Sequence, residues 1–542
     1  MFKKRGKILL SLLLVALALS SFNGCSDSAA KDDKFEVSIF RIDSLPQPDP
    51  DNKIYKMLKD EFGVTFKFEF LAGDLKQKLG VMTASGDYPD LISYDPLLKE
   101  AGALIPLEDL IKDNCPNLYA HYKPFWNQVK EPDDGHMYCM PDYGRFYGGV
   151  SDLTYEGNGF WIQKAVLAEF GYPKPTTLDE YFDLIEKYKA KYPTIDGQPT
   201  IGFEILNYQW RNFVLRNPPQ FLAGFPNDGD VTVDPITYKA EIFANKDIAK
   251  RYYKKLNEVN AKGLINKDTF VNNYDQYMAN MASGRVLGVP DQHWQFGKAE
   301  ETLKLKERFE RTYVPLGLTY DKSIKDHYRD RSLLNLHRGY GITVDCKDPL
   351  RILKLFDALL DEKWQKIFDW GIEGEDYMVN EKGRFYKTPE QLKTMGDVPW
   401  QSKNKALALY ESMPKREGFY SDGNSVRDLN QPEVYFSQLS AYDKEFFGKY
   451  GISSPIEFLN APPENLPCYP AWTIDLGEGS DAQIANQQMQ DLGVKYLPRI
   501  ILAAPADFEK IWQEYVDAFD KINVKAYEDK INKEIQFRVK NW

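Results

Sequence analysis

The sequence predicts an α/β protein with two or more lobes, and three observations support this. Strand-like and helix-like periodicities alternate from residue 35 to residue 93, which is typical of a mostly parallel sheet covered by helices. A second series of helical patterns follows a glycine- and aromatic-rich stretch at 143–149. The chain has 542 residues, 43% of them hydrophobic and 27% charged, which is enough for more than one lobe with a sizeable core.

The first expected unit begins with alternating strands and helices. Residues 35–39 and 64–70 carry apolar side chains at every second position, which predicts two strands. Helical spacing over 54–62 and 75–82 predicts a helix after each strand, and 90–93 predicts a third strand. This order predicts a parallel sheet with crossover helices.

The second expected unit is richer in helices. Apolar residues recur with helical spacing over 161–170 before a Gly and a Pro, so we expect a helix there. Thr177 and Glu180 form a capping-box pattern at the start of another helix. Helical spacing over 508–522 predicts a core-facing helix near the C-terminus.

Residues 1–24 have the features of a signal peptide. Lys and Arg at 3–7 precede an apolar run over 8–19, which is shorter than the roughly 20 residues of a membrane span. Cys25 then resembles the lipidated residue of a bacterial lipoprotein, and the alternative is an ordinary secretory signal with an incidental thiol. We expect 25–34 to be a flexible tether and the mature protein to be extracytoplasmic, lipid-anchored to the outer face of the cell membrane.

Charge and cysteine content exclude several classes of function. The formal net charge is −11 and no Lys/Arg cluster follows the signal peptide, so nucleic acid is not an expected partner. No Cys or His spacing suggests a metal or redox site, and we expect no cofactor. Two disulfides are possible, with Cys115 and Cys139 as the favoured pair, and four buried thiols are equally compatible. The four cysteines are Cys115, Cys139, Cys346 and Cys468.

Ten short segments follow one another in an order that resembles a known family. They are ASGDYPDLI (84–92), IPLEDL (105–110), DGHMY (134–138), FWIQK (160–164), GYP (171–173), TLDEY (177–181), GLI (263–265), GITV (341–344), WGIEGEDY (370–377) and PRIILA (498–503). Each is weak alone. Together they are similar to the extracellular solute-binding proteins (family 1 type) of bacterial ABC sugar importers, in the large lipoprotein branch of Gram-positive bacteria.

This resemblance implies a two-lobed periplasmic-binding-protein-like fold (type II), each lobe a mostly parallel sheet flanked by helices, with the ligand cleft between the lobes. It implies a monomer that captures an oligosaccharide and delivers it to the permease subunits of an ABC transporter. We expect lobe 1 at 35–145 with a returning segment around 292–345. Lobe 2 is expected at 146–291 with 346–500, followed by C-terminal helices at 501–542.

The resemblance also bears on calcium. Members of this branch with an EF-hand-like loop carry alternating Asp and Asn after a helix of the second lobe. The corresponding stretch here, 192–199, has one carboxylate instead of the several oxygen ligands that Ca²⁺ needs. We therefore expect no calcium at that loop.

A sugar site needs flat aromatic surfaces and planar hydrogen-bonding groups, because sugar rings present C–H faces and a belt of hydroxyls. Asp291 and Trp294 are the first choice, since they follow the apolar run 286–289 as a strand-end loop would; the alternative for Trp294 is packing between lobes. The other candidates stand in irregular, Gly-rich or polar surroundings. They are Trp370 and Glu373, Asp142, Tyr143 and Arg145 at the first crossing, and Trp210, Arg338, Tyr340 and Trp472.

The sequence leaves two alternatives open. No GxSxG, HExxH, GxxxxGK[ST] or GxGxxG motif is present, so we expect no enzyme, but an exported glycoside hydrolase could use two of the 80 acidic residues, Glu373 and Asp376 included. A peptide or another polar ligand is also compatible. Arg338 or Arg145 in the cleft would favour an acidic sugar, whereas sugar identity, length and linkage are not predicted.

Overall fold

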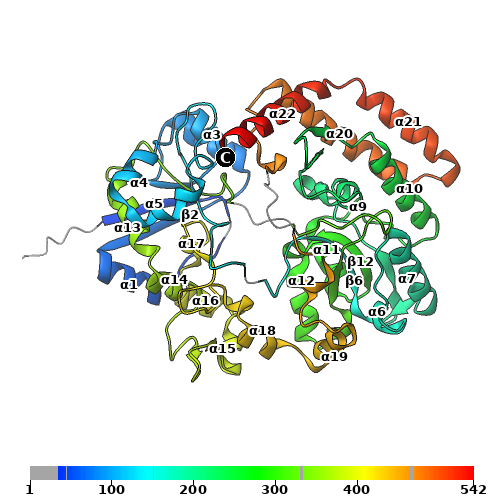
Figure 1. The fold of residues 1–542 in the computed structure, drawn as a ribbon, viewed down its shortest axis with the longest axis horizontal. Helices are drawn as coiled ribbons and strands as arrows, with labels where there is room; N and C mark the ends of the chain where they lie inside the picture. The colour runs from blue at the N-terminus through cyan, green and yellow to red at the C-terminus, as the bar shows by residue number, and fades with distance from the viewer. Residues whose placement is uncertain (1–34, 44, 151, 330–333, 463–468) are drawn as a thin grey trace, which may run out of the picture.

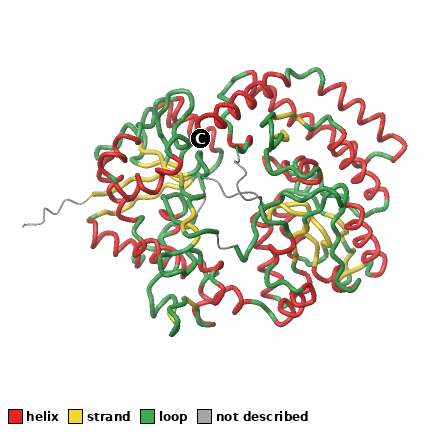
Figure 2. The backbone as a smooth tube through the Cα atoms, in the orientation of Figure 1, coloured by secondary structure: helices red, strands yellow, loops and turns green. Residues whose placement is uncertain are grey.

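The computed structural model describes residues 35–43, 45–150, 152–329, 334–462 and 469–542. The expected signal peptide, the lipidated Cys25 and the tether lie outside these residues. Figure 1 shows two lobes side by side, and Figure 2 shows two main groups of strands, each flanked by helices, with short strands outside them. No helix in the described part of the chain is long and apolar enough to cross a membrane.

The first lobe is built on a five-stranded sheet whose parallel part was predicted from the sequence. The strand order is β2 (Val64–Phe70), β1 (Phe35–Arg41), β3 (Leu91–Ser93), β14 (Gly339–Ile342), β4 (Met140–Pro141). β1 is parallel to β2 and β3, whereas β14 is antiparallel to β3 and β4. Because β14 comes late in the chain, this sheet joins segments that are far apart in the sequence.

Helices cover both faces of this sheet and close its core. Val37 and Ile39 of β1 pack in one cluster with buried residues of α13 and α14, while Phe40 faces a second cluster with Leu79. The helices of this lobe are α1 (Lys53–Phe62), α2 (Leu75–Ser85), α3 (Pro96–Glu100), α4 (Glu108–Asn114), α5 (Pro116–Tyr122), η1 (Lys123–Phe125), α13 (Pro349–Leu359), α14 (Glu362–Asp369), α16 (Val398–Asn404) and α17 (Leu407–Tyr410).

The second lobe contains a four-stranded sheet in the order β13 (Tyr313–Leu316), β6 (Asn158–Gln163), β12 (Val286–Gln292), β9 (Ile201–Phe203). Only β12 and β9 are parallel, and β6 runs antiparallel to both of its neighbours. This sheet therefore differs from the mostly parallel one that we expected.

Helices surround the second sheet and form an arm at its outer edge. They are η2 (Gln209–Asn212), α6 (Lys164–Glu169), α7 (Leu178–Lys191), α8 (Phe213–Arg216), α9 (Pro218–Leu222), α10 (Asp247–Ala261), α11 (Tyr274–Ala282), α12 (His293–Leu305), η3 (Phe309–Arg311), α19 (Ala441–Tyr450), η5 (Pro455–Phe458), η6 (Ala471–Thr473), α20 (Asp481–Leu502), η7 (Pro505–Asp507), α21 (Phe508–Phe519) and α22 (Val524–Asn541). In Figure 1 the arm of α20, α21 and α22 arches from the second lobe toward α3 of the first. Asn127 Nδ2 donates to the Asn541 carbonyl at 3.1 Å, so the arm contacts both lobes.

Short elements complete the fold. Trp370, Tyr377, Phe385 and Val434 form a small separate core between a hairpin and neighbouring helices. The short strands and helices are β5 (Phe146–Tyr147) paired with β17 (Glu417–Gly418), β7 (Thr194–Ile195) with β8 (Gln198–Pro199), β10 (Val231–Val233) with β11 (Ala240–Ile242), β15 (Met378–Val379) with β16 (Phe385–Tyr386), α15 (Pro389–Thr394), η4 (Asp428–Asn430) and α18 (Pro432–Gln438).

Two expectations differ from the structure. The chain from α12 to β13 belongs to the second lobe because β13 pairs with β6, and 349–413 packs in the first lobe because α13 and α14 fill the core beneath β1. The expected segments 292–345 and 346–500 are thus each divided between the lobes. The helix expected over 161–170 begins only at Lys164, because 161–163 belong to β6, which is buried on both faces.

Candidate functional site

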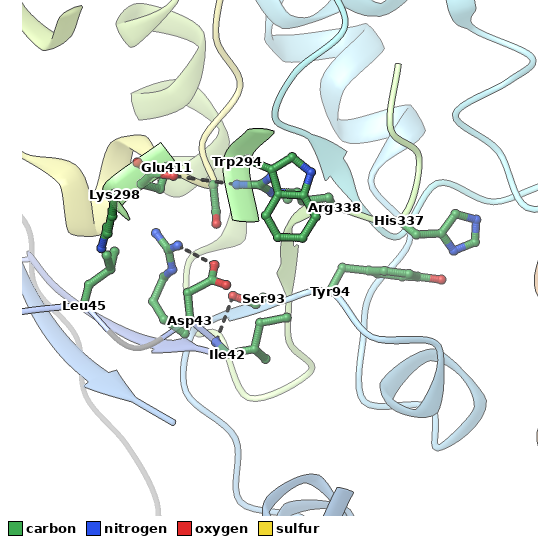
Figure 3. A pocket seen from close by; sticks show the side chains of 13 residues that line it. Ile42, Asp43, Leu45, Ser93, Tyr94, Trp294, Lys298, His337, Arg338 and Glu411 are labelled. Atoms are coloured by element: carbon green, nitrogen blue, oxygen red, sulfur yellow. Dashed lines mark hydrogen bonds and ion pairs between the residues drawn. The ribbon is translucent and has the colours of Figure 1, made fainter. Parts of the chain in front are cut away.

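A cavity of about 640 Å³ lies between the two lobes (Figure 3). The first lobe contributes residues at the ends of β1 and β3, residues that border β14 and residues that follow α17, and the second lobe contributes one face of α12. The lining residues are Arg41, Ile42, Asp43, Leu45, Ser93, Tyr94, Trp294, Lys298, His337, Arg338, Gly339, Glu411 and Ser412. Since β1 and β3 are parallel, their carboxyl ends meet at one edge of the sheet, which is where open α/β sheets bind ligands.

Asp43 is held at this edge by the buried side chain of Arg41. Arg41 Nη2 donates to Asp43 Oδ2 at 2.9 Å, and Nη1 donates to the Ala408 carbonyl at 2.8 Å. The Asp43 side chain is about half exposed, at 54%. The carboxylate is therefore oriented by the protein and open to a hydrogen-bond donor from a ligand.

Arg338 lies beside Asp43 and shares its charge between two carboxylates. Its Nε is 3.1 Å from Asp142 Oδ2 and its Nη2 is 3.6 Å from Glu411 Oε2, while its guanidinium lies 5.4 Å from the Tyr143 ring centroid. Asp142 is fully buried, and burial raises its pKa to about 6 against the opposing charges of Lys415 and Arg338. Arg338 thus covers a buried carboxylate and keeps about half of its own side chain exposed in the cavity.

Trp294 faces these groups from the second lobe. It stands in the first turn of α12, 47% exposed, and its ring lies 6.1 Å from the Trp210 ring at an interplanar angle of 11°. The Arg211 guanidinium lies 4.4 Å from the Trp210 centroid and 4.2 Å from that of Tyr274. This part of the second lobe is therefore a flat, exposed aromatic surface of the kind that binds the C–H face of a sugar ring.

Buried Asp291 and partly buried His293 hold the start of α12. Asp291 accepts hydrogen bonds from the Tyr277 hydroxyl at 2.6 Å and from Gln295 Nε2 at 2.7 Å, and burial raises its pKa to about 7. His293 lies between Glu156, at 2.8 Å, and Glu300, at 2.7 Å. Burial lowers the pKa of His293, but the two carboxylates outweigh it and raise the pKa to about 9, so the ring is a cation at neutral pH.

Residues 53–369 match the family described as bacterial extracellular solute-binding protein, and this match covers more than half of the chain. The chain belongs to this family. Of the curated relatives of this solute-binding protein, the fructooligosaccharide ABC transporter substrate-binding protein FusA of Streptococcus pneumoniae is 27% identical over 301 residues, or 49% of this chain and 54% of FusA. The polygalacturonan/rhamnogalacturonan-binding protein YtcQ of Bacillus subtilis is 23% identical over 440 residues, or 76% of this chain and 80% of YtcQ. The alignment thus spans about half the length of FusA and most of YtcQ.

Solved structures share the fold of this solute-binding protein. An extracellular solute-binding protein from Bifidobacterium longum subsp. infantis has a TM-score of 0.67 at 16% identity, over 94% of this chain and 99% of that one. FusA of S. pneumoniae in complex with kestose has a TM-score of 0.63 at 18% identity, over 94% and 100%. The predicted two-lobed α/β fold is confirmed.

The structure brings several predicted site residues of the solute-binding protein together. Trp294 and Arg338 line the cavity from opposite lobes, and Trp210 extends the surface of Trp294. Asp142 and Tyr143 lie directly behind Arg338. These five residues come from crossings and strand ends that are far apart in the sequence.

Other predicted site residues of the solute-binding protein are buried in the fold and do not face the cavity. Asp291 lies within β12 and orients α12 from beneath, so it does not line the cavity. Trp370 is fully buried and donates to the Ser425 carbonyl at 3.0 Å, and Tyr340 is fully buried and donates to the Ala408 carbonyl at 3.1 Å. Trp370 is thus buried under a loop, and neither ring is available to a ligand.

Three further candidates lie outside the lining of this cavity. Arg145 donates to the carbonyls of His121 and Phe146, at 3.2 and 2.8 Å, which places its guanidinium in the packing of the first lobe. Glu373 is exposed on a loop, and Trp472 is half exposed on the second lobe. Their types suit a sugar site, but the fold places them elsewhere.

Several lining residues were not predicted, and some carry a usable signal. Asp43 stands two residues after β1 and Tyr94 follows β3 directly, so the rule that ligands bind at the carboxyl ends of parallel strands would have found them. Lys298 stands four residues after Trp294 on the same helix. His337 and Glu411 carry no such signal, because only the folded chain brings them to this edge.

The structure bears on the expected disulfides and on the expected absence of calcium at the loop 192–199. Cys115 and Cys139 are buried and unbonded because they pack in different clusters, so the favoured disulfide is absent; Cys346 is also free, and Cys468 lies outside the described residues. Asp196 pairs with Arg308 Nη1 at 2.7 Å. Within the described residues, no group of three or more His, Cys, Asp or Glu side chains could hold a metal ion.

Proposed function

We propose that this protein captures an oligosaccharide outside the membrane and delivers it to the permease subunits of an ABC transporter, with no chemistry on the sugar. The observation that carries the proposal is the exposed Trp294 surface, which faces Asp43 and Arg338 across a cavity between two lobes. An aromatic plane with charged bidentate groups opposite it matches the faces and the hydroxyl belt of a sugar. The names of FusA and YtcQ, which refer to fructooligosaccharide and to polygalacturonan and rhamnogalacturonan, support this class of ligand.

Cavity size also supports an oligosaccharide. About 640 Å³ lies within the range of roughly 300–1,000 Å³ that is typical of small-molecule sites.

We propose that ligand bridges the lobes and stabilises a closed state of a monomer, which the permease then recognises. Lipidation at Cys25 would hold that monomer at the outer face of the membrane.

No observation favours the hydrolase. The Asp376 carboxylate accepts from the Ile372 backbone N–H at 2.7 Å and pairs with Lys53 at 2.8 Å, and Glu373 is exposed on the same loop. Neither carboxylate lines the cavity between the lobes. Asp376 is therefore engaged in contacts within the first lobe, and neither carboxylate faces the cavity in which a sugar could bind.

A thermal-shift screen of residues 26–542 against neutral and acidic oligosaccharides tests the proposal. A ligand at 100 times its Kd adds roughly 2.7 kcal/mol to the free energy of unfolding, which is enough to raise the Tm visibly. We expect a shift with the sugar recovered intact. New reducing ends would show a hydrolase, and no shift with any sugar would contradict the proposed ligand class.

The same screen on two tryptophan variants locates the site. Trp294→Ala removes the aromatic surface, so we expect affinity to fall about tenfold or more. Trp472→Ala is the matched control, because Trp472 is exposed to a similar extent, 50%, but lies outside the cavity lining. Equal effects of the two substitutions would place the ligand elsewhere.

A further inference from the structure

The cations of the cavity differ in how they are paired. Arg41 is occupied by Asp43 and by the Ala408 carbonyl, and Arg338 is shared between Asp142 and Glu411. Both arginines therefore have their charge compensated by carboxylates of the first lobe. Neither one alone indicates the charge of a ligand.

Lys298 is the third cation of the lining, and it is different. It lies on α12 in the second lobe, is exposed, and forms no ion pair with any carboxylate in the part of the chain that the structure describes. Lys304, further along the same helix, has Glu300 at 3.8 Å. Figure 3 shows the Lys298 side chain within the group of residues that surround the cavity.

The position of Lys298 relative to Trp294 is set by helix geometry. The two residues are four apart on α12, so their side chains share one face of the helix with Cβ atoms about 5–6 Å apart. A sugar ring that stacks on Trp294 presents its edge substituents, including the exocyclic carbon, at the rim of the indole. Lys298 stands on the same face of α12, one helical turn along.

We infer that the cleft takes an acidic oligosaccharide, with a uronic acid stacked on Trp294 whose carboxylate pairs with the Lys298 ammonium. A charge-assisted hydrogen bond between ammonium and carboxylate is about twice as strong as one between neutral groups. The net charge of −11 does not oppose this pairing, because charges more than about 8–10 Å away are largely screened at physiological salt. This inference rests on the proposed function and names its substrate class.

Titration calorimetry with matched ligands tests the inference. The probes are oligomers of galacturonic, mannuronic and glucuronic acid, each paired with its carboxyl-reduced neutral counterpart of equal length. For the wild-type protein we expect at least one acidic oligomer to bind about tenfold or more tightly than its neutral counterpart, with a Kd that rises with salt. In Lys298→Gln the ratio of the two Kd values should fall to near one.

Lys306→Gln is the matched control, because it removes the same charge from an exposed position at the C-terminal end of the same helix. We expect this variant to keep the acidic preference. Neutral oligomers that bind as tightly as acidic ones, or a preference that survives in Lys298→Gln, would overturn the inference and leave oligosaccharide capture standing. Binding of neither set, nor of any sugar in the thermal-shift screen, would instead overturn the proposed function.

Discussion

The charge of His293 connects the segment before β6, which carries Glu156, with helix α12, which carries Trp294. Its imidazolium lies between Glu156, on the first crossing, and Glu300, on α12, and its backbone N–H donates to the Gly157 carbonyl at 3.3 Å. The next residue is Trp294. The position of this tryptophan therefore depends on a cluster of three charged groups that no sequence pattern indicates, because Glu156 and Glu300 are far apart in the chain.

We expect the contribution of His293 to stability to be lost at alkaline pH. Its pKa is raised to about 9 in the folded protein and is about 6.5 when unfolded, so the contribution is complete below pH 6.5 and disappears as the pH rises through 9. The linked free energy is on the order of 3 kcal/mol. Lys304 and Lys164 also face Glu300, and the charge of Glu300 raises the pKa of Lys304 above its usual value.

Urea unfolding of the wild type and of His293→Gln at pH 6, 7.5 and 9.5 measures this effect. The wild type should be the more stable protein at pH 6, and the difference between the two should shrink toward pH 9.5. A difference that stays constant with pH would show that His293 acts through packing alone. Ligand affinity measured at the same three pH values shows whether the orientation of Trp294 follows the charge.

At the scale of elements, the sequence indicated secondary structure well where one face is solvated. β1, β2, α1 and α2 lie where periodicity placed them, and Thr177 caps α7 through the Glu180 backbone N–H. β6 was missed because it is buried on both faces, which removes the alternation that identifies a strand. Periodicity also could not predict that β14 pairs with β3 and β4, because these two strands lie far upstream in the sequence.

Gly339 is required where β14 meets β4. Its φ is +143°, and a Cβ there would lie 2.0 Å from the Met140 carbonyl oxygen. We expect Gly339→Ala to lower the free energy of unfolding by about 2 kcal/mol or more, because backbone cannot move aside as a side chain can.

Gly80 of α2 provides the control for this substitution. A Cβ at Gly80 meets nothing within 4 Å, and alanine is the better helix former by about 1 kcal/mol. Gly80→Ala should therefore be neutral or stabilising in the same thermal unfolding experiment. A Gly339→Ala variant as stable as the wild type would show that the β4–β14 contact is not held as closely as the structure has it.

At the scale of the whole molecule, the lobes meet at the cavity and again at the helical arm. Lys76 of α2 pairs with Glu478 at 2.7 Å, and Asn127 bonds to Asn541. The two-lobed organisation could be predicted from the order of motifs. The arm could not, because the helix expected over 508–522 was identified only as core-facing, and only the fold brings the ends of the arm to the first lobe.

We expect ligand to reduce the radius of gyration of the solution ensemble, because a sugar held between Trp294 and Arg338 contacts both lobes at once. Small-angle X-ray scattering with and without a ligand found by the screen measures this. Scattering profiles that stay identical would contradict closure.

Lys76→Glu should weaken ligand binding although Lys76 does not line the cavity. Reversing this charge opposes Glu478 across the lobes, and we expect Kd to rise roughly two- to fivefold at low salt, with less effect at high salt. Lys56→Glu is the control, since its partner Asp51 belongs to the same lobe. Equal Kd values for both variants would show that the arm contact does not favour closure.

The late return of β14 to the first sheet has a consequence for how the chain acquires its structure. β14 inserts between β3 and β4, so the first sheet stays incomplete until the polypeptide has been made beyond residue 342. The second lobe waits longer still, because Ile531 and Ile535 of α22 belong to its core. Contacts between such distant segments make folding slow, and the second lobe cannot complete its core until the C-terminal helix has been made. The second lobe of a nascent chain therefore lacks its full tertiary structure until synthesis is nearly finished.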